Sequence, residues 1–354
     1  MSEFALCTYG VQGFDGVGIV VEPLGESPTV LDLARCSEWL NVYLNRRDLL
    51  RWPKLDMQDA LNNWDLVLEQ VEIILSLYEK GDLDVSKAEG LCFQASEVRF
   101  LPPLSFPPKI LNAGANYYDH IKEMGTVEID PKRDVPYFFP KTPNSSVIGD
   151  GDTIVLPHSE HWSVAQYSDW EVELAVVIGR RAKDVAVEDA NDYIAGYTIY
   201  QDISGRDKMI REEGPFPWDW HANKCNDTFA PMGPWIIPAK QMGDVSDISI
   251  KSSINGEVQQ DSSTAQMIWP VQELLSCASA VSRLEPGDVI ATGTCAGVGM
   301  AQGLDLKPGE LPDLFPHMLN GGGRFLTEGD ILTSEIAGIG KLTNYVSTSD
   351  PKLP

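Results

Sequence analysis

Residues 168–179 read SDWEVELAVVIG, which begins as an alternation of polar and apolar side chains and ends as a continuous apolar run. A strand with this pattern enters a hydrophobic core at its far end. Because successive side chains on a strand point to opposite faces, we expect Asp169, Glu171 and Glu173 on one face, about 7 Å apart. The segment therefore predicts a row of carboxylates beside a core.

These carboxylates need compensation if their face is buried. An ionised carboxylate is costly away from water, and either a raised pKa with a shared proton or a bound metal would relieve that cost. Asp202 follows a second strand-like run, residues 194–201, and adds a third carboxylate. Three carboxylates without histidine or cysteine suit Mg²⁺, Mn²⁺ or Ca²⁺ rather than zinc or copper. The alternative is an exposed strand face that forms ordinary salt bridges.

A second group of interest lies in residues 116–125, NYYDHIKEMG. His120 and Glu123 are three positions apart, so one helical turn would place imidazole and carboxylate side by side. A carboxylate beside a histidine orients the ring and raises its basicity, which suits a general base. The alternative is a surface turn in which the two side chains meet incidentally.

Two further segments could supply donors for an anionic intermediate: the ammonium group of Lys224 and the backbone of residues 293–299, GTCAGVG. The glycines are not in the order of a dinucleotide-binding loop, G-x-G-x-x-G. The sequence also has no G-x-S-x-G elbow and no cysteine nucleophile motif. A metal with a general base is therefore the most coherent chemistry.

The overall composition excludes several classes of protein. The chain has 354 residues, 43% hydrophobic and 22% charged, as globular proteins do. Its net charge of -25 disfavours nucleic acid and anionic lipid as partners. The six cysteines lack the spacing of zinc sites and are expected to be reduced. We find no leader sequence and no apolar run of roughly 20 residues, so we expect no membrane insertion and a cytoplasmic location.

The chain divides near four prolines in residues 102–108, which predict a linker. Residues 1–104 include a helical stretch between Met57 and Lys80, which Gly81 would end, and are expected to form a small α+β domain. Residues 105–348 form the second domain, with 349–354 as a tail. Short β-branched runs at 170–178, 194–200, 248–254, 288–292 and 331–336 make it mostly β. The predicted fold class is α+β, predominantly β.

Taken together, the segments of residues 105–347 resemble the fumarylacetoacetate hydrolase family. The resemblance rests on these separated motifs: Asn116-Tyr117 with His120, Phe139 with Lys141, DWEVEL at 169–174, QDISGRD at 201–207, KCNDTF at 224–229, Asn255-Gly256-Glu257, and Gly293-Thr294. It implies a β-roll or β-sandwich catalytic domain, usually in a homodimer. It also implies a divalent cation held by Glu171, Glu173 and Asp202.

The resemblance further implies roles for other side chains. A pair matching His120 and Glu123 would activate water, with Lys224 beside it. The positions expected to bind substrate are Tyr117, Lys141, Gln201, Arg206 and Thr294. The chain departs from the compact family pattern in its first hundred residues, in residues 301–324, and in PFPWDW at 215–220. The last two segments could form a lid or a pocket that sets specificity, with His221 or His317 contributing.

These features lead to a hypothesis of metal-dependent hydrolysis of a carbon–carbon bond in a small β-diketo, acylpyruvate-like acid. His120, oriented by Glu123, would deprotonate the attacking water, and the carbanion would leave as a metal-bound enolate. Lys224 and the loop at Thr294 would stabilise the oxyanion. One alternative is a decarboxylase or tautomerase of oxaloacetate-like acids. Another is a non-catalytic binding protein that the metal stabilises.

Overall fold

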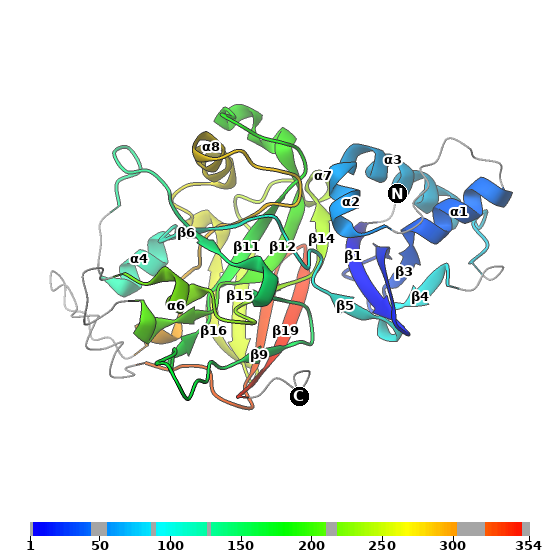
Figure 1. The fold of residues 1–354 in the computed structure, drawn as a ribbon. Coiled ribbons are helices and arrows are strands. Elements are labelled where there is room, and N and C mark those ends of the chain that lie inside the picture. Colours follow the sequence, from blue (N-terminus) through cyan, green and yellow to red (C-terminus); the bar gives the residue numbers. More distant parts are fainter. Residues whose placement is uncertain are drawn as a thin grey trace.

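The computed structural model describes residues 3–43, 55–85, 90–125, 129–209, 218–302 and 323–348 (Figure 1). The part of the chain before residue 105 forms strands flanked by helices. Its elements are β1 (Phe4–Val11), β2 (Phe14–Val21), β3 (Thr29–Asp32), α1 (Leu33–Tyr43), α2 (Met57–Asn62), α3 (Trp64–Glu79), β4 (Cys92–Gln94), η2 (Ala95–Glu97) and β5 (Arg99–Leu101).

Local sequence explains the turns of this part. Gln12 and Gly13 both have positive φ, 48° and 82°, which is the conformation of a tight two-residue hairpin turn between β1 and β2. The predicted helix between Met57 and Lys80 is two helices, because the backbone leaves the helical conformation at Asn63. Its predicted end is confirmed, since Gly81 follows α3 with a φ of 73°.

The rest of the described chain contributes to two packed sheets and a separate pair of short strands, with short helices around them. Its first elements are β6 (Ile110–Gly114), α4 (Tyr118–Met124), β7 (Tyr137–Lys141), α5 (Pro143–Ser146), β8 (Val147–Ile148), β9 (Thr153–Val155), β10 (Ser168–Asp169), β11 (Val172–Ile178), η3 (Val187–Tyr193), β12 (Ile194–Gln201), β13 (Ser204–Gly205), η4 (Arg206–Lys208) and α6 (Trp220–Lys224). The remainder are β14 (Ala230–Pro238), α7 (Ala239–Met242), β15 (Ser249–Ile254), β16 (Glu257–Ser263), η5 (Thr264–Gln266), α8 (Val271–Val281), β17 (Val289–Ala291), η6 (Gly299–Ala301), β18 (Ile331–Ile336) and β19 (Gly340–Ser347).

The larger sheet runs through the whole molecule in the order β4-β3-β2-β1-β14-β12-β11-β17-β6-β7, with β5 on β1 and β8 on β14. The smaller sheet has the order β16-β15-β18-β19-β9, and its strands β15, β18 and β19 lie against β11, β12 and β14. Asn255 and Gly256 make the tight turn between β15 and β16, both with positive φ. Strands occur at each of the segments predicted for this region, although the first begins only at Val172.

The predicted single strand at residues 168–179 is interrupted. Asp169 belongs to β10, which pairs with β13, whereas Glu173 lies in β11, which pairs with β12 and β17. Trp170, between them, is fully buried, and its indole N–H donates to the carbonyl of Gly297 at 3.1 Å. The change of partner strand at this point separates Asp169 from the two glutamates.

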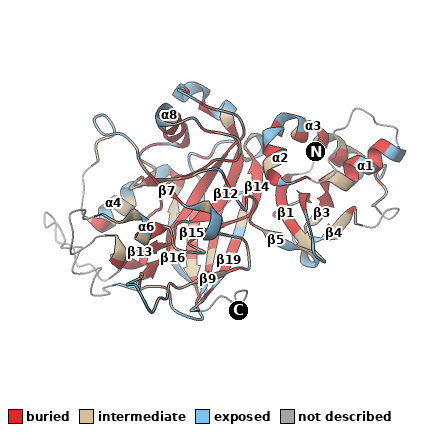
Figure 2. Cartoon of the chain, viewed as in Figure 1, coloured by how far each residue is buried: buried red, intermediate tan, exposed pale blue. Residues whose placement is uncertain are grey.

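The core is continuous between the two parts of the chain. One hydrophobic cluster contains Leu61 and Leu75 of the N-terminal helices together with Ala175 and Val177 of β11. Figure 2 shows buried residues along the central strands of both parts. The boundary predicted at residue 104 lies between β5 and β6, but both sheet and core extend across it. A division into two domains stays a prediction.

Candidate metal centre and catalytic pair

Three buried carboxylates meet where β11 begins and β12 ends. Val172 is paired with Gln201 in the antiparallel ladder, so Glu171 and Asp202 are neighbours just outside it. The backbone N–H of Asp202 donates to the carbonyl of Glu171 at 2.9 Å. Glu171, Glu173 and Asp202 each offer an oxygen, and these oxygens lie within 4.8 Å of one another. The structure thus brings together the three predicted metal ligands.

Two lysines accompany these carboxylates. Lys224, from α6, donates to Oε2 of Glu171 at 2.7 Å and to Oδ2 of Asp202 at 2.6 Å. Lys141, from β7, donates to Oδ1 of Asp202 at 2.5 Å and to the carbonyls of Ile203 and Phe229. Burial opposes the charge of Lys224, but Asp202 and Glu171 raise its pKa above the ordinary value. Burial lowers the pKa of Lys141, which Asp202 partly offsets.

Arg206 links the centre to a fourth buried acid. Its Nη2 lies 2.6 Å from Oε1 of Glu171, and its Nε donates to Oδ2 of Asp169 at 2.8 Å. Asp169 also accepts from the backbone N–H groups of Gly299 and Met300, at 2.7 and 3.0 Å. Asp169 is therefore a neighbour of the centre that orients Arg206, and Arg206 in turn orients Glu171.

The electrostatics of the centre differ between its two glutamates. Burial acts to raise the pKa of Glu171, but Lys224, Arg206 and His120 outweigh it and hold that pKa well below its usual range. For Glu173, burial comes first and the charges of Asp202 and Glu171 add to it, so its pKa lies well above the usual range. The two glutamates differ because the neighbouring cations outweigh burial at Glu171 but not at Glu173.

The surroundings of Glu173 are suited to a bound cation in addition to the lysines and the arginine. It accepts a hydrogen bond from the N–H of Gly293 at 2.8 Å, and no lysine, arginine or histidine of the described residues forms an ion pair with it. An oxygen-only set with one uncompensated buried carboxylate suits a hard divalent cation such as Mg²⁺, Mn²⁺ or Ca²⁺. The donor set therefore fits the predicted metal.

The predicted catalytic pair lies on α4. Nδ1 of His120 and Oε1 of Glu123 are 2.7 Å apart, and both side chains are more than four-fifths buried. Oε2 of Glu123 accepts from the N–H of Gly297 at 2.7 Å, which fixes the carboxylate. Glu173 of the carboxylate centre accepts from the N–H of Gly293 in the same loop, residues 293–297. One loop thus links the pair to the carboxylate centre, so the contact is not an incidental surface one.

The other predicted site residues lie close by but are engaged within the protein. Gln201 accepts from the N–H of Glu171 at 2.9 Å and donates to Ser334 at 2.8 Å. The hydroxyl of Thr294 donates to the carbonyl of Val172 at 2.9 Å. Tyr117 is fully buried, and burial, Cys295 and Glu173 raise the pKa of its hydroxyl. Substrate contact by these residues stays a prediction.

Sequence reasoning missed Gln260, which joins several parts of the site. Its amide donates to Thr294 at 2.8 Å and accepts from the N–H of Val172 at 3.1 Å and from Ser252 at 2.9 Å. The side chain is fully buried. A glutamine in a polar strand segment gives no local signal of this role.

Residues 303–322 and 210–217, with His317, lie outside the described residues, and His221 lies exposed on α6.

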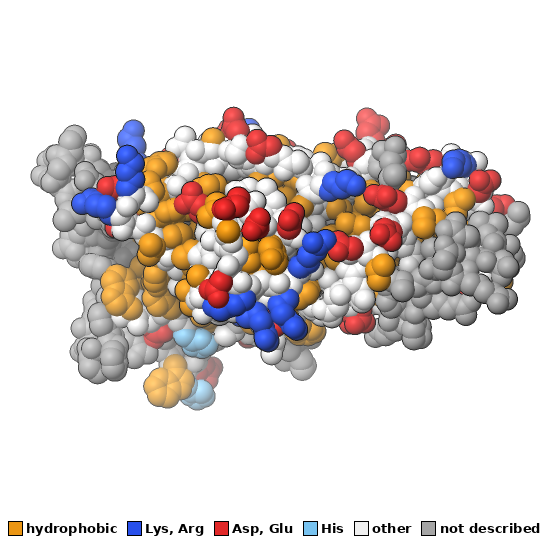
Figure 3. Space-filling view, turned by 90° about the horizontal axis from the view of Figure 1, so that it is seen from above, with side chains coloured by type: hydrophobic (Ala, Val, Ile, Leu, Met, Phe, Trp, Pro, Cys, Tyr) orange, Lys and Arg blue, Asp and Glu red, His pale blue; other side chains and the backbone are white. Residues whose placement is uncertain are grey.

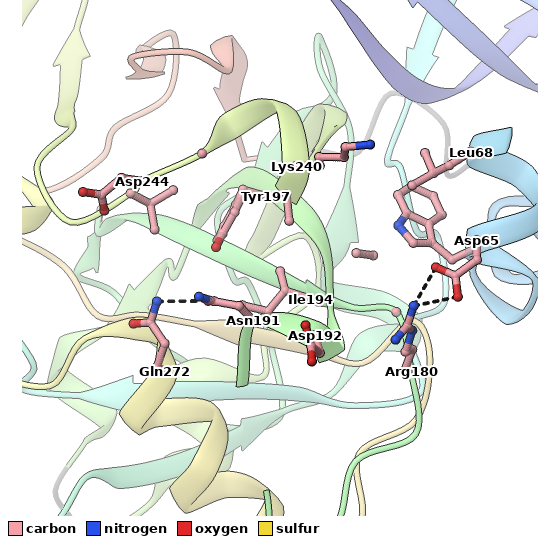
Figure 4. A pocket seen from close by; sticks show the side chains of 16 residues that line it. Asp65, Leu68, Arg180, Asn191, Asp192, Ile194, Tyr197, Lys240, Asp244 and Gln272 are labelled. Atoms are coloured by element: carbon pink, nitrogen blue, oxygen red, sulfur yellow. Dashed lines mark hydrogen bonds and ion pairs between the residues drawn. The ribbon is translucent and has the colours of Figure 1, made fainter. Parts of the chain in front are cut away.

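A separate cavity of about 640 Å³ lies between α3 and the larger sheet. Trp64 and Leu68 contribute to its lining from α3, and Tyr197 does so from β12. Figure 4 shows Arg180 bridging to Asp65, with two hydrogen bonds at 2.9 and 2.7 Å. None of the predicted site residues lines this cavity, so it is distinct from the carboxylate centre.

The buried carboxylate centre beside a histidine–glutamate pair, on two packed sheets, defines a class of enzymes. The family model described as fumarylacetoacetate (FAA) hydrolase C-terminal matches residues 109–347. The chain belongs to the fumarylacetoacetate hydrolase family, so the predicted family and α+β fold are confirmed. Among the described residues, no helix is long and apolar enough to cross a membrane.

Named relatives give the range of activities in this family. The chain is 37% identical over 292 residues to human oxaloacetate tautomerase FAHD2B, mitochondrial, with 81% of this chain and 82% of that protein covered. Fumarylacetoacetate hydrolase from Exiguobacterium antarcticum is similar in structure, with a TM-score of 0.68, 26% identity and coverage of 98% and 100%. Fumarylpyruvate hydrolase from Pseudomonas aeruginosa, solved with Mn²⁺ and pyruvate, has a TM-score of 0.53, 30% identity and coverage of 68% and 90%.

Proposed function

We propose that the protein is a metal-dependent enzyme that interconverts the keto and enol forms of pyruvates carrying a second carbonyl group on C3, as oxaloacetate does. The observation that carries this proposal is the His120–Glu123 pair, which is held by the same loop that holds Glu173 of the buried carboxylate centre. The similarity to human oxaloacetate tautomerase over four-fifths of both chains supports it. The earlier hypothesis of hydrolysis becomes the second candidate.

The residues that would hold the cation are Glu171, Glu173 and Asp202. A bound divalent cation would act as a Lewis acid that polarises the 2-oxo group and favours loss of a proton from C3. Lys224 keeps two of the ligands in place through its hydrogen bonds to Glu171 and Asp202. Arg206 fixes Glu171 from the other side.

The proton transfer belongs to His120. A carboxylate accepts hydrogen bonds, so Glu123 places the ring proton on Nδ1 and leaves Nε2 as the base. His120 takes the proton from C3 of the keto form and then delivers it to the oxygen on C2, which gives the enol. The ammonium of Lys224, which Asp202 and Glu171 keep charged, would stabilise the negative charge that develops on that oxygen. The reverse transfers restore the keto form, and no bond to carbon other than C–H is broken.

Hydrolysis of an acylpyruvate-like acid is the second candidate. The same pair could take a proton from water, and the fumarylpyruvate hydrolase of similar structure holds Mn²⁺ and pyruvate. Hydrolysis would consume water and leave solvent ¹⁸O in a carboxylate product, whereas tautomerisation would not. Release of CO₂ from oxaloacetate would instead point to decarboxylation.

The test measures enol-to-keto conversion of oxaloacetate, and cleavage of a panel of acylpyruvates, with Mg²⁺ or Mn²⁺ and with EDTA. We expect metal-dependent conversion that is lost in the Glu171→Ala/Glu173→Ala variant. His120→Ala should lose about a hundredfold or more in rate while it still binds Mn²⁺ in calorimetry. Glu188→Gln, an exposed acid on η3, serves as the control. Full activity in EDTA would refute the metal dependence.

Other expectations from the sequence remain proposals. A homodimer is supported only by the family, and light scattering would measure it. A cytoplasmic location is likewise proposed, and the human relative is named as mitochondrial. The absence of nucleic-acid binding follows from the net charge of -25.

A further inference from the structure

Four aromatic side chains lie in contact with one another, and we call them the aromatic wall. Tyr137 and Phe139 belong to β7, Trp220 begins α6, and Trp218 lies two residues before it. The rings of Phe139 and Trp220 are stacked, with centroids 4.8 Å apart and planes at 13°. Trp218 lies parallel to Trp220 at 6.3 Å, and Tyr137 lies 5.8 Å from Trp220. Trp220 is thus the centre of the wall.

The inner end of the wall touches the carboxylate centre. Nζ of Lys224 lies 5.1 Å from the centroid of the Phe139 ring. Trp220 and Lys224 are four residues apart on α6, so both project from one face of that helix. Phe139 and Lys141 are two residues apart on β7, so both project from one face of that strand. Each element therefore presents a lysine at the centre and an aromatic ring beside it.

Among the described residues, exposure differs along the wall. Phe139 is 5% exposed, whereas Tyr137 and Trp218 are 48% and 51% exposed. Tyr137 rests over Gly114, where an added Cβ would lie 2.8 Å from its ring. Figure 1 draws α6 and α4, which carries His120, at the same end of the molecule, and Figure 3 shows hydrophobic side chains at that end. Exposure rises steadily from the centre outward.

We propose that the aromatic wall binds the group attached to C3 of the substrate and selects a planar, conjugated acyl group over a carboxylate. This inference rests on the proposed function, because it takes the pyruvate part of the substrate to lie at the carboxylate centre. A flat group extending outward from Lys224 would meet Phe139 first and then the exposed rings of Trp218 and Tyr137. Because Phe139, Trp220 and Trp218 lie parallel to one another, they present ring edges to such a group, and edge-to-face contact with these rings favours planar, conjugated groups.

The charges around the wall support this selection. The three buried cations of the centre, Lys141, Lys224 and Arg206, each already form an ion pair with a carboxylate. A second carboxylate on C3 would therefore lie against apolar rings instead of an uncompensated buried cation. Burying a charge without a partner is far more costly than burying an aryl or alkenyl ketone, which carries no charge, in the same place.

The kinetic test compares benzoylpyruvate with oxaloacetate as metal-dependent substrates. We expect the wild type to have the higher kcat/KM for benzoylpyruvate. In Trp218→Ala and Tyr137→Ala, the ratio of the two kcat/KM values should fall by about two- to tenfold, which is the range of one aromatic contact. Trp218→Phe should retain most of the ratio. Tyr345→Ala on β19, an aromatic residue of similar exposure (49%) outside the wall, is the control and should not change it.

A binding experiment separates the wall from the reaction. Calorimetry with the Mn²⁺-loaded protein would measure cinnamate, which is planar, against 3-cyclohexylpropionate, which is not. We expect tighter binding of cinnamate, weakened in Trp218→Ala, even if no substrate is turned over and the proposed function fails. Three results would each refute the proposed role of the wall, whether or not oxaloacetate is tautomerised. They are equal binding of the two acids, an unchanged ratio of the two kcat/KM values in both alanine variants, and a higher wild-type kcat/KM for oxaloacetate.

Discussion

Asp169→Asn should weaken both the fold and the metal site without altering any proposed metal ligand. The carboxylate of Asp169 is fully buried, holds Nε of Arg206 at 2.8 Å, and accepts from the backbone at Gly299 and Met300. Asparagine has the same shape and keeps one acceptor oxygen, but it brings an N–H₂ group toward donors and removes the negative charge. Arg206 would then rely on Glu171 alone.

The expected magnitudes follow from these contacts. Removing one partner of a buried ion pair typically costs about 3–5 kcal/mol of stability. Because Arg206 keeps its contact with Glu171 and one acceptor remains for the backbone, we expect a loss of about 3 kcal/mol. Loss of a partner that orients a metal ligand typically lowers metal affinity about 10- to 100-fold. We expect about a tenfold weaker affinity for Mn²⁺, since Arg206 acts on only one of the three ligands.

The assays are urea unfolding of the metal-free protein and Mn²⁺ titration in a calorimeter. Asp261→Asn is the matched control, because Asp261 forms an exposed ion pair with Lys251 at 3.2 Å, and such pairs contribute about 1 kcal/mol or less. A variant at Asp169 that unfolds at the same urea concentration as the control and binds Mn²⁺ as tightly as the wild type would refute the orienting role.

Two further predictions test other parts of the molecule. Gly297→Ala should destabilise the protein, because φ is +106° there and an added Cβ would collide with the carbonyl of Gln259. The N–H that holds Glu123 would move, so we expect turnover to fall at least about tenfold. A wild-type kcat would contradict this. Burial raises the pKa of the Asp32 carboxyl above 3.8, although the hydroxyl of Tyr9 donates a hydrogen bond to this carboxyl. The stability that protonated Asp32 contributes is therefore present at low pH and is lost as pH rises through the folded-state pKa. Asp32→Asn, which does not titrate, should therefore gain stability relative to the wild type as pH rises above about 4 in urea titrations, and parallel pH profiles would show that Asp32 titrates normally.

The central carboxylates could be predicted from the sequence because their placement follows from local rules. Glu171 and Glu173 are two residues apart, which puts them on one side of the chain, and Asp202 ends the strand that pairs with theirs. The contact between His120 and Glu123 likewise follows from the pitch of a single helical turn. These are relations over a few residues or between neighbouring strands.

The identity of the compensating cations could not be predicted in this way. Lys141 reaches Asp202 across 61 residues, and Arg206 reaches Asp169 across 37. No periodic pattern states which lysine or arginine will meet which acid, because that depends on how β7, η4 and α6 are placed by the packing of the sheets. The departure of Asp169 from the row of glutamates has the same origin, since a change of partner strand is a property of the whole sheet.

β1 pairs with β14, with Leu6 opposite Ile236, and this pairing affects which edge of the larger sheet is exposed to other molecules. Without the first hundred residues, this side of the larger sheet would end in a strand with unpaired N–H and C=O groups, which is a template for pairing with another molecule. The N-terminal strands carry that hydrogen bonding outward through β2 and β3 to the three-residue strand β4. The N-terminal strands thus cover an edge of the larger sheet that would otherwise be available for pairing with another molecule.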